Sequence, residues 1–313
     1  MVSLGRLGIY LITFVVAVSI LAALTNFWQS IDYYVYKTFY LNDSEEIKLR
    51  SDIALIDLPY HAEGTTTFDR GNYRKRLSDL LDTIGSRYDA NERPEAVLLD
   101  IFFTNDIQEL ETLKNAVKRL RDKQIKVYAV YDMRDHEQTF LEKHDAKQAQ
   151  DLYENYFEGY RLHTMFEEKM GVLSYQSELK FTSEHGGHQF VEALASKVAR
   201  DINMVDAPPS EPRGYILPLG NEQSIVNQTY AFTHAANETV GGKFSKELNI
   251  NDKILIVGSL EDDQLVGIQG GTKTGTHLLA WALFDQLKGN QLAKQPLNNI
   301  AVNLALVLCF ACF

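Results

Sequence analysis

Cysteine is scarce in this chain and absent from its central part. The 313 residues contain two cysteines, Cys309 and Cys312, and both lie in the last apolar run of the sequence. No disulfide framework therefore holds the central part together. A cysteine-free domain is compatible with the cytoplasm and with an extracytoplasmic space, so the cysteine count does not decide the compartment.

An excess of positive charge is also absent. The chain has 31 lysines and arginines against 42 aspartates and glutamates, which gives a formal net charge of -11. Proteins that bind nucleic acid through a broad electrostatic surface need a concentration of basic residues. We therefore expect no nucleic-acid partner.

Charge is missing altogether from a long stretch near the N-terminus. No charged residue occurs between Arg6 and Asp32, and residues 7–24 are nearly all apolar. At about 1.5 Å per residue, a helix of that length nearly crosses a hydrocarbon core roughly 30 Å thick. Phe27 and Trp28 follow, where an aromatic interfacial belt would lie. We expect residues 1–28 to form a transmembrane anchor. The alternative, a cleaved signal peptide, usually has a shorter apolar region and a more basic start.

The C-terminal end is uncharged as well. No residue from Gln295 to Phe313 is charged, and Ile300–Phe313 is almost wholly apolar. A full span needs about 20 residues, so we expect residues 295–313 to begin a second transmembrane helix that is truncated here. The alternative is a buried C-terminal helix. The basic residues near the two ends do not orient the chain by the positive-inside rule.

The central part alternates between short apolar runs and segments of helical periodicity. The runs typical of buried strands are Asp52–Leu58, Ala96–Phe103, Val127–Tyr131 and Ile254–Gly258, with weaker candidates at Tyr215–Leu219 and Tyr230–Thr233. Helices are expected after Asp69, after Asn105 or Asp106, and over His136–Phe166, Gln189–Ile202 and Thr276–Leu287. Strands separated by helices favour an α/β fold. We expect residues 29–294 to form a single domain with a central, largely parallel sheet covered by helices.

Two segments together resemble the CHASE2 sensory domain family. The first, residues 52–105, has a strand that ends in Asp57, an arginine-bearing helix start (FDRGNYRKRLSDLL) and then RPEAVLLDIFF. The second, residues 253–292, has KILIVGSLEDDQ, a glycine-rich loop and GTHLLAWALFDQLKGNQL. The residues at places comparable to the family's late motif are Gly258, Asp262 or Asp263, Gly275, His277 and Ala280. The spacing of the histidine and alanine differs slightly from the family's.

The resemblance implies an extracytoplasmic (periplasmic) sensor domain of a bacterial receptor in the inner (plasma) membrane. In that family one membrane helix precedes the domain and usually three follow, leading to a cytoplasmic kinase, cyclase or similar output module. We therefore expect a receptor rather than an enzyme, with an unknown small molecule or protein as ligand and association into a homodimer. The polar residues 136–184 have no strong counterpart in the family. Two alternatives stay open: a membrane-anchored interaction protein without a small-molecule ligand, and a membrane-tethered hydrolase.

Carboxylates follow the predicted strands at places where open α/β sheets bind ligands. Asp57 and Asp100 lie at or near strand ends, where they could contact a ligand, hold a loop or pair with Arg70 or Arg74. The helix start at Thr274–Thr276 could receive an anionic group, because its backbone amides lack intrahelical partners. The candidate ligand-binding residues are Asp57, Arg70, Asp100, Thr274, Thr276 and His277.

For the other motifs in the chain, we predict no phosphate binding, no metal binding and no catalysis. GIQGGTKT, residues 267–274, nearly matches a phosphate-binding loop, but Thr272 stands where the last glycine must be. We interpret it as a flexible loop. His185 and His188 could share a metal ion, but the sequence provides no third ligand, so no metal site is predicted. The chain shows neither a Ser-His-Asp nor a Cys-His arrangement, so we predict no catalytic residue and no cofactor.

Overall fold

The structure is a computed structural model of the chain. It describes residues 8, 10–18, 48–60, 70–89, 92–101, 103, 110–131, 152–153, 155–157, 159–162, 166–169, 172–182, 188–203, 214–217, 219–220, 222–233, 242–260, 264–268 and 271–289. The predicted second span, residues 295–313, lies outside these residues, as does much of the predicted first span. Within the ranges given, no helix is long and apolar enough to cross a membrane.

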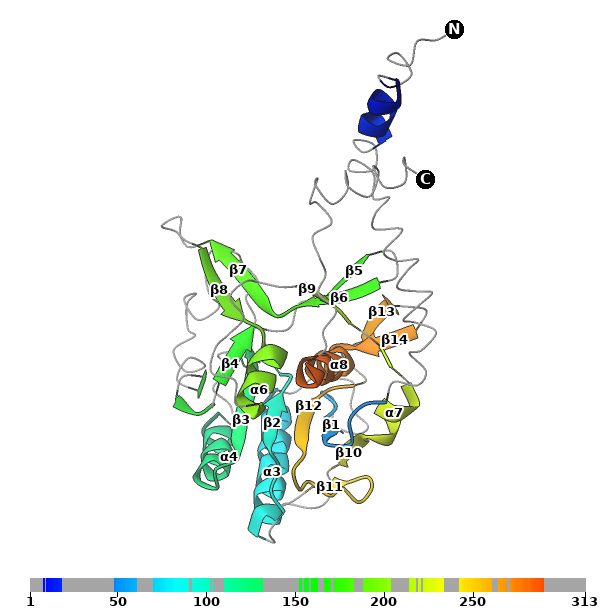
Figure 1. Cartoon of the computed structure of the whole chain (residues 1–313). Helices are drawn as coiled ribbons and strands as arrows, with labels where there is room; N and C mark the ends of the chain where they lie inside the picture. The colour runs from blue at the N-terminus through cyan, green and yellow to red at the C-terminus, as the bar shows by residue number, and fades with distance from the viewer. Residues whose placement is uncertain are drawn as a thin grey trace.

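A seven-stranded sheet forms the centre of the protein (Figure 1). Its strands, in spatial order, are β11 (Lys243–Phe244), β10 (Thr229–Thr233), β1 (Ile53–Asp57), β12 (Ile254–Gly258), β2 (Ala96–Leu99), β3 (Lys126–Tyr131) and β4 (Gly159–Leu162). All neighbouring pairs are parallel except β10 and β11. The prediction of a largely parallel sheet is therefore confirmed. Strands buried on both faces are apolar throughout, which explains why β1, β2 and β12 stand out in the sequence.

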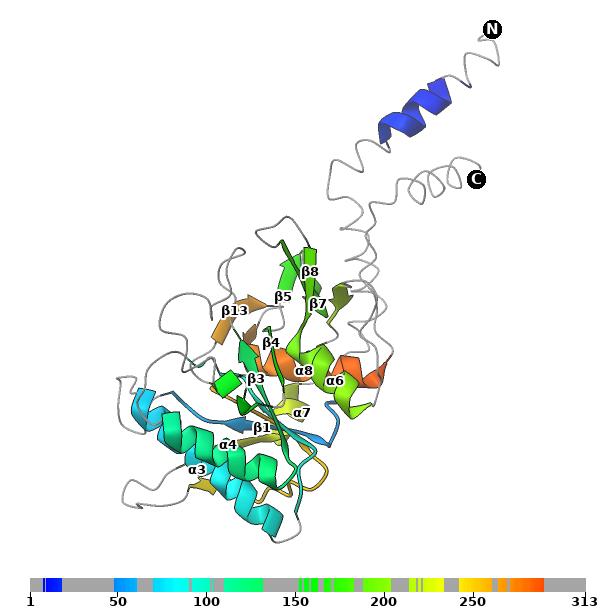
Figure 2. The ribbon, with the colours of Figure 1, turned by 90° about the vertical axis from the view of Figure 1, so that its left-hand side faces the viewer.

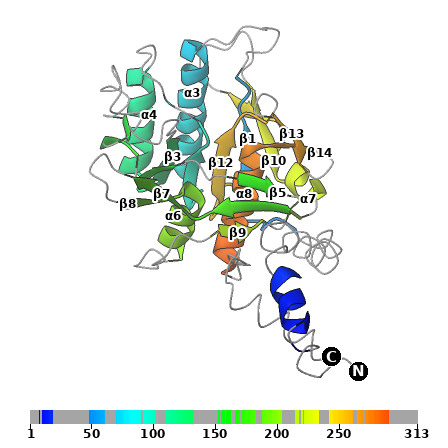
Figure 3. The ribbon, with the colours of Figure 1, turned by 90° about the horizontal axis from the view of Figure 1, so that it is seen from above.

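Helices cover both faces of this sheet (Figure 2). The helices α3 (Arg70–Asp89) and α4 (Leu110–Asp122) lie side by side on one face (Figure 3). The helices α6 (Leu194–Ile202) and α8 (Gly275–Lys288) cover the other. Strand β1 shows the division directly, because Ala54 and Ile56 pack with α3 and α4 while Ile53 and Leu55 pack with α6 and α8. This alternation follows from the two-residue period of a strand.

A smaller sheet and two hairpins accompany the central sheet. The smaller sheet contains β5 (Phe166–Lys169), β6 (Val172–Gln176) and β9 (Gly214–Ile216). The hairpins pair β7 (Glu178–Thr182) with β8 (His188–Glu192) and β13 (Gln264–Ile268) with β14 (Gly271–Thr274). The short helix α7 (Glu222–Asn227) precedes β10. Leu173 and Tyr175 of β6 share one apolar cluster with Trp281 of α8 and Ile256 of β12. Helix α8 is therefore packed between two sheets, and its apolar surface on all sides fits that position.

Three local predictions are wrong, and strand pairing explains each. The expected helix over residues 136–166 gives way at Gly159–Leu162 to β4, which pairs with the edge of β3. The expected helix over residues 189–202 begins only at Leu194, because Gln189–Glu192 belong to β8 and pair with β7. The expected loop at residues 267–274 includes β14, which pairs with β13. Strand pairing overrides local propensity in all three segments. The partner of β4 is a distant strand, whereas β8 and β14 each pair with the other strand of a hairpin.

Candidate functional site

The carboxyl ends of β1, β12 and β2 meet at one edge of the central sheet, with β12 in the middle. The chain leaves β1 and β2 toward α3 and α4 on one face, and leaves β12 toward α8 on the other. In open α/β sheets, ligands bind where neighbouring strands send the chain to opposite faces. The topology therefore places a candidate ligand site at this edge, where the predicted carboxylates also lie.

Asp100 connects β2 to the first turn of α8. It directly follows the strand, and its backbone N–H donates to the carbonyl oxygen of Val257 at 2.8 Å. Its carboxylate Oδ2 accepts a hydrogen bond from Oγ1 of Thr276 at 2.8 Å. Both side chains are buried, Thr276 at 1% exposure and Asp100 at 7%. The sheet edge and the helix start are thus joined by a polar contact in a water-poor environment.

Gly258 makes this close approach of α8 possible. It is the last residue of β12, and a Cβ atom built there would lie 2.2 Å from Oγ1 of Thr276. A glycine in a strand often marks a place where another part of the chain comes very close. The first turn of α8 therefore occupies the space that a side chain at position 258 would take.

Asp57, on the neighbour of β12 opposite β2, holds the loop that follows β12. It is the last residue of β1 and is partly exposed, and its Oδ1 accepts a hydrogen bond from the backbone N–H of Leu260 at 2.9 Å. This contact agrees with the loop-holding alternative for Asp57. Asp57 and Asp100 therefore flank the end of β12, one on each neighbouring strand.

Side chains from α3 complete the cluster. Arg76 donates through Nη2 to the backbone carbonyl oxygens of Pro59 at 2.8 Å and Tyr60 at 3.1 Å, which fixes the chain just after β1. Its guanidinium lies 5.6 Å from the ring centroid of Tyr73, and the rings of Tyr60 and Tyr73 meet edge to face at 5.2 Å. An arginine against an aromatic ring is a favourable contact in a buried setting.

The electrostatics of Tyr73 show that these groups act on one another. Burial raises the pKa of Tyr73 well above its ordinary value, and the nearby Tyr60, Asp100 and Asp57 raise it further, while Arg76 lowers it. The phenol therefore stays protonated at neutral pH. The influence of both aspartates on one side chain of α3 indicates that Tyr73 belongs to the same polar cluster.

The start of α8 is capped from within the chain. Thr274 is the N-cap residue, and its side-chain oxygen accepts a hydrogen bond from the backbone N–H of His277 at 3.1 Å. Threonine is among the preferred residues at this position because it satisfies an amide that has no helical partner. Thr274 is buried and His277 is half-buried.

The structure brings most of the predicted site residues to one place. Asp100 and Thr276 are in contact, Asp57 lies across β12, and Thr274 and His277 belong to the same helix start. Arg70 begins α3, but its side chain lies outside the described part of the structure. Sequence reasoning missed Tyr60, Tyr73 and Arg76 as site residues. The only available signal was the hydroxyl of Tyr73 on the otherwise apolar face predicted for this helix.

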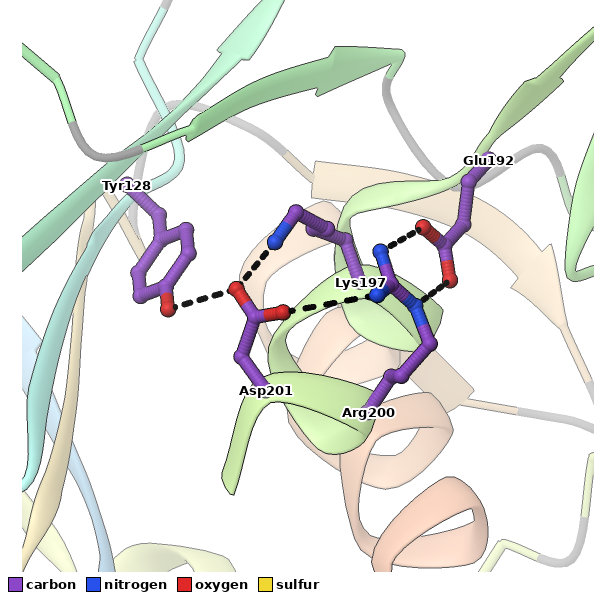
Figure 4. Close-up of polar contacts among 5 residues, drawn as sticks. All are labelled: Tyr128, Glu192, Lys197, Arg200 and Asp201. Carbon is purple, nitrogen blue, oxygen red and sulfur yellow. Dashed lines mark hydrogen bonds and ion pairs between the residues drawn. The ribbon is translucent and has the colours of Figure 1, made fainter. Parts of the chain in front are cut away.

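A second polar cluster ties α6 to its surroundings (Figure 4). The Tyr128 hydroxyl donates to Asp201 at 2.9 Å, Lys197 bonds the same carboxylate, and Arg200 donates to both carboxylate oxygens of Glu192 at 3.0 and 2.8 Å. Burial acts to raise the pKa of Asp201, but the hydrogen bonds from Lys197 and Tyr128 bring it below its ordinary value. Two acids balance two bases here, so the cluster serves to hold β3, α6 and β8 together.

A surface hollow of about 590 Å³ lies on the outer side of α4. The described residues that line it are Lys118, Arg121, Asp122, Asn155 and Tyr156. Two of these residues are hydrogen-bonded to each other, because Arg121 donates to the carbonyl oxygen of Asn155. The lining has both signs of charge and contains none of the predicted site residues, so we do not assign the hollow to the candidate site.

The residues that the structure describes contain no candidate metal centre. Nowhere among them do three or more histidine, cysteine, aspartate or glutamate side chains lie close enough together to hold an ion. Of the predicted histidine pair, His185 lies outside the described residues. Comparisons with protein-family models, with curated proteins and with solved structures found no match. The resemblance to the CHASE2 family therefore stays a prediction.

Proposed function

We propose that this chain is the ligand-sensing region of a bacterial membrane receptor, with a CHASE2-like domain outside the cytoplasm and an anchor in the inner membrane. A small molecule or protein binds the α/β domain and shifts it between two conformations. The membrane helices pass that shift to an output module. The ligand must bind the two conformations with different affinities, because equal binding would shift nothing.

The observation that carries this proposal is the position of α8. Its first turn contacts Asp100 through Thr276 at the carboxyl edge of the sheet. Its last residue, Lys288, comes shortly before the uncharged run that begins at Gln295. A ligand that alters the contact at the first turn would act on a helix that leads, in sequence, to the predicted membrane segment. Packed helices respond to such changes by small rigid shifts.

The N-terminal segment supports the membrane anchor. Residues 10–18 are helical and stand clear of the α/β body (Figure 2). Tyr10, Ile12 and Phe14 are exposed by 70%, 65% and 68%. Exposed apolar surface costs about 25 cal/mol per Å² in water. A lipid bilayer around this segment would remove that cost.

The topology of the domain can be tested by cysteine labelling in intact cells. Cys309 and Cys312 are changed to serine, and single cysteines are introduced at the exposed positions Lys75 and Glu247. We expect a membrane-impermeant thiol reagent to label both without permeabilisation of the inner membrane. Ser196→Cys is the matched control, because this buried position should react only after denaturation. Labelling of Lys75→Cys and Glu247→Cys only after permeabilisation would contradict the proposal.

Ligand binding at the carboxyl edge needs a separate test. Candidate small molecules are screened by the thermal shift of the full chain in detergent micelles. A ligand of the proposed site raises the melting temperature of the wild type but not that of Asp100→Asn, since the variant changes the charge at the edge of β2. Equal shifts in both proteins would place the binding site elsewhere.

A further inference from the structure

A buried carboxylate links the last turns of α8 to the sheet β5–β6–β9. Asp285 is 4% exposed, and its Oδ2 accepts a hydrogen bond from the hydroxyl of Tyr175 on β6 at 2.7 Å. Nε2 of Gln286 donates to the same hydroxyl oxygen at 2.8 Å. The tyrosine hydroxyl therefore donates to one residue of α8 and accepts from the next.

The surroundings of this carboxylate are mainly apolar. Among the residues that the structure describes, Tyr175 on β6 and Lys288 on its own helix are titratable groups that act on Asp285, and Tyr215 on β9 acts on Tyr175. The elements α6, β1 and β12 face α8 with apolar side chains, among them Leu194, Val198, Ile53, Leu55, Ile254 and Ile256. From β14, the side chain that the structure describes is that of the capping Thr274.

An ionised carboxylate in such a place is costly. Removal from water disfavours the charged form, and a hydrogen bond from a neutral hydroxyl such as that of Tyr175 offsets only part of that cost. Burial raises the pKa of Asp285 from 3.8 to about 6, although the hydrogen bond from Tyr175 and the charge of Lys288 act to lower it. Near neutral pH the protein thus holds a charge that its interior disfavours, and in mild acid that charge disappears.

We propose that Asp285 and Tyr175 form a pH-sensitive latch between α8 and β6, which protonation of Asp285 tightens and ionisation loosens. When Asp285 is protonated, the contact keeps its hydrogen-bonding groups without a buried charge. When it is ionised, separation of β6 from α8 becomes easier, because water then solvates the carboxylate. The latch lies at the end of α8 opposite the contact between Thr276 and Asp100, so both act on one helix.

The size of the effect follows from the two titration ranges. If Asp285 titrates near 3.8 when the latch is open and near 6 when it is closed, the opening equilibrium rises about tenfold between pH 5 and pH 7.5. The latch itself does not rest on the proposed receptor function. The proposed receptor function matters only for whether the latch meets the pH outside the cell. The cysteine-labelling experiment tests that point separately.

Hydrogen exchange measures the latch directly. Amide protection over residues 172–176 and 278–287 is recorded at pH 5 and pH 7.5 for the full chain in detergent micelles, after correction for the intrinsic pH dependence of exchange. We expect the wild type to lose about tenfold in protection at the higher pH. The isosteric Asp285→Asn cannot ionise, so its protection should be equal at both values. Asp252→Asn, at an exposed turn, is the control and should behave as the wild type.

A second variant distinguishes a pH-sensitive latch from a contact that only adds stability. Tyr175→Phe removes the hydrogen bond of the latch, so protection over residues 172–176 and 278–287 should be lower than in the wild type at pH 5. That bond also lowers the pKa of Asp285, so the midpoint of the remaining pH dependence should move to higher pH. Equal protection of the wild type at both pH values would overturn the proposal. So would a pH dependence in Asp285→Asn that matches the wild type, because the responsible group would then lie elsewhere.

Discussion

The hydroxyl of Thr276 lies 2.8 Å from a carboxylate oxygen of Asp100, although 176 positions separate the two residues in sequence. This contact joins the first turn of α8 to the carboxyl end of β2 and crosses the end of β12 between them. It therefore connects three elements that the chain forms at widely separated points. It also positions one of the two aspartates of the candidate site.

Loss of the Thr276 hydroxyl should destabilise the domain. Thr276→Val has nearly the same shape but removes a donor from the buried Asp100 carboxylate, which typically costs about 1–3 kcal/mol. We expect the free energy of unfolding, measured by urea denaturation of the full chain in detergent micelles, to fall by that amount. Thr276→Ser retains the hydroxyl and should lose clearly less. Equal losses in the two variants would show that the methyl group, not the hydrogen bond, matters.

Substitution of Gly258 should force β12 and α8 apart. A Cβ atom there would lie 2.2 Å from Oγ1 of Thr276, so Gly258→Ala requires a shift that costs about 1–3 kcal/mol. Thr276→Ala removes the atom that clashes. The double variant should therefore be more stable than the sum of the single effects predicts, with a coupling of about 0.5–3 kcal/mol. Additive effects in this double-mutant cycle would contradict the close approach.

The stability that Asp201 provides should depend on pH. Its pKa lies below the ordinary 3.8 in the folded protein, so between the two values the unfolded chain binds more protons. The contribution is then fully present above the unfolded pKa and is lost as the pH falls through the folded one. We expect Asp201→Asn to cost about 1–3 kcal/mol at pH 7 and clearly less at pH 3, as measured by urea denaturation. An equal cost at both pH values would show that Asp201 acts through packing alone.

Arginine geometry should matter at Arg200 and not at Arg119. Both side chains donate two hydrogen bonds to one carboxylate, of Glu192 and Asp82 respectively. The first pair is 20% and 8% exposed, whereas the second is 52% and 42% exposed. Arg200→Lys should lower the free energy of unfolding by about 1–2 kcal/mol, because lysine cannot reproduce the paired hydrogen bonds.

Arg119→Lys is the matched control for that variant. Its ion pair is exposed to water, and such pairs contribute little to stability. We expect its melting curve to overlay that of the wild type. If both lysine variants lost the same stability, burial would not be what distinguishes the two pairs.

Some elements could be predicted because their signal is local. Strands β1, β2, β3 and β12 are apolar runs, since a parallel strand covered on both faces exposes no side chain to water. Helices α3, α4 and α8 show the helical spacing of apolar residues that one or more buried faces require. Strands β4, β8 and β14 had no such signal, because each forms through pairing with another strand. The partner of β4 is the distant β3, and the partners of β8 and β14 are the other strands of their hairpins.

The candidate site, too, could be predicted only where the signal is local. Asp57 ends an apolar strand and Asp100 directly follows one, so their position at the carboxyl edge of the sheet could be predicted from the sequence. The roles of Tyr73 and Arg76 could not, because their neighbours come from other elements. The contact of Asp285 with Tyr175 was equally hidden, since 110 positions separate these residues.

The sequence by itself determined the α/β class and the type of the elements with a local signal, namely strands β1, β2, β3 and β12 and helices α3, α4 and α8. Burial on one or two faces gives such an element a regular spacing of apolar residues. Only the tertiary structure decided that β12 lies between β1 and β2, which sets Asp57 and Asp100 on either side of Gly258. It also decided that α8 is enclosed between two sheets and holds Asp285 away from water. Strand order and enclosure depend on packing between distant segments, and no local period of the chain specifies them.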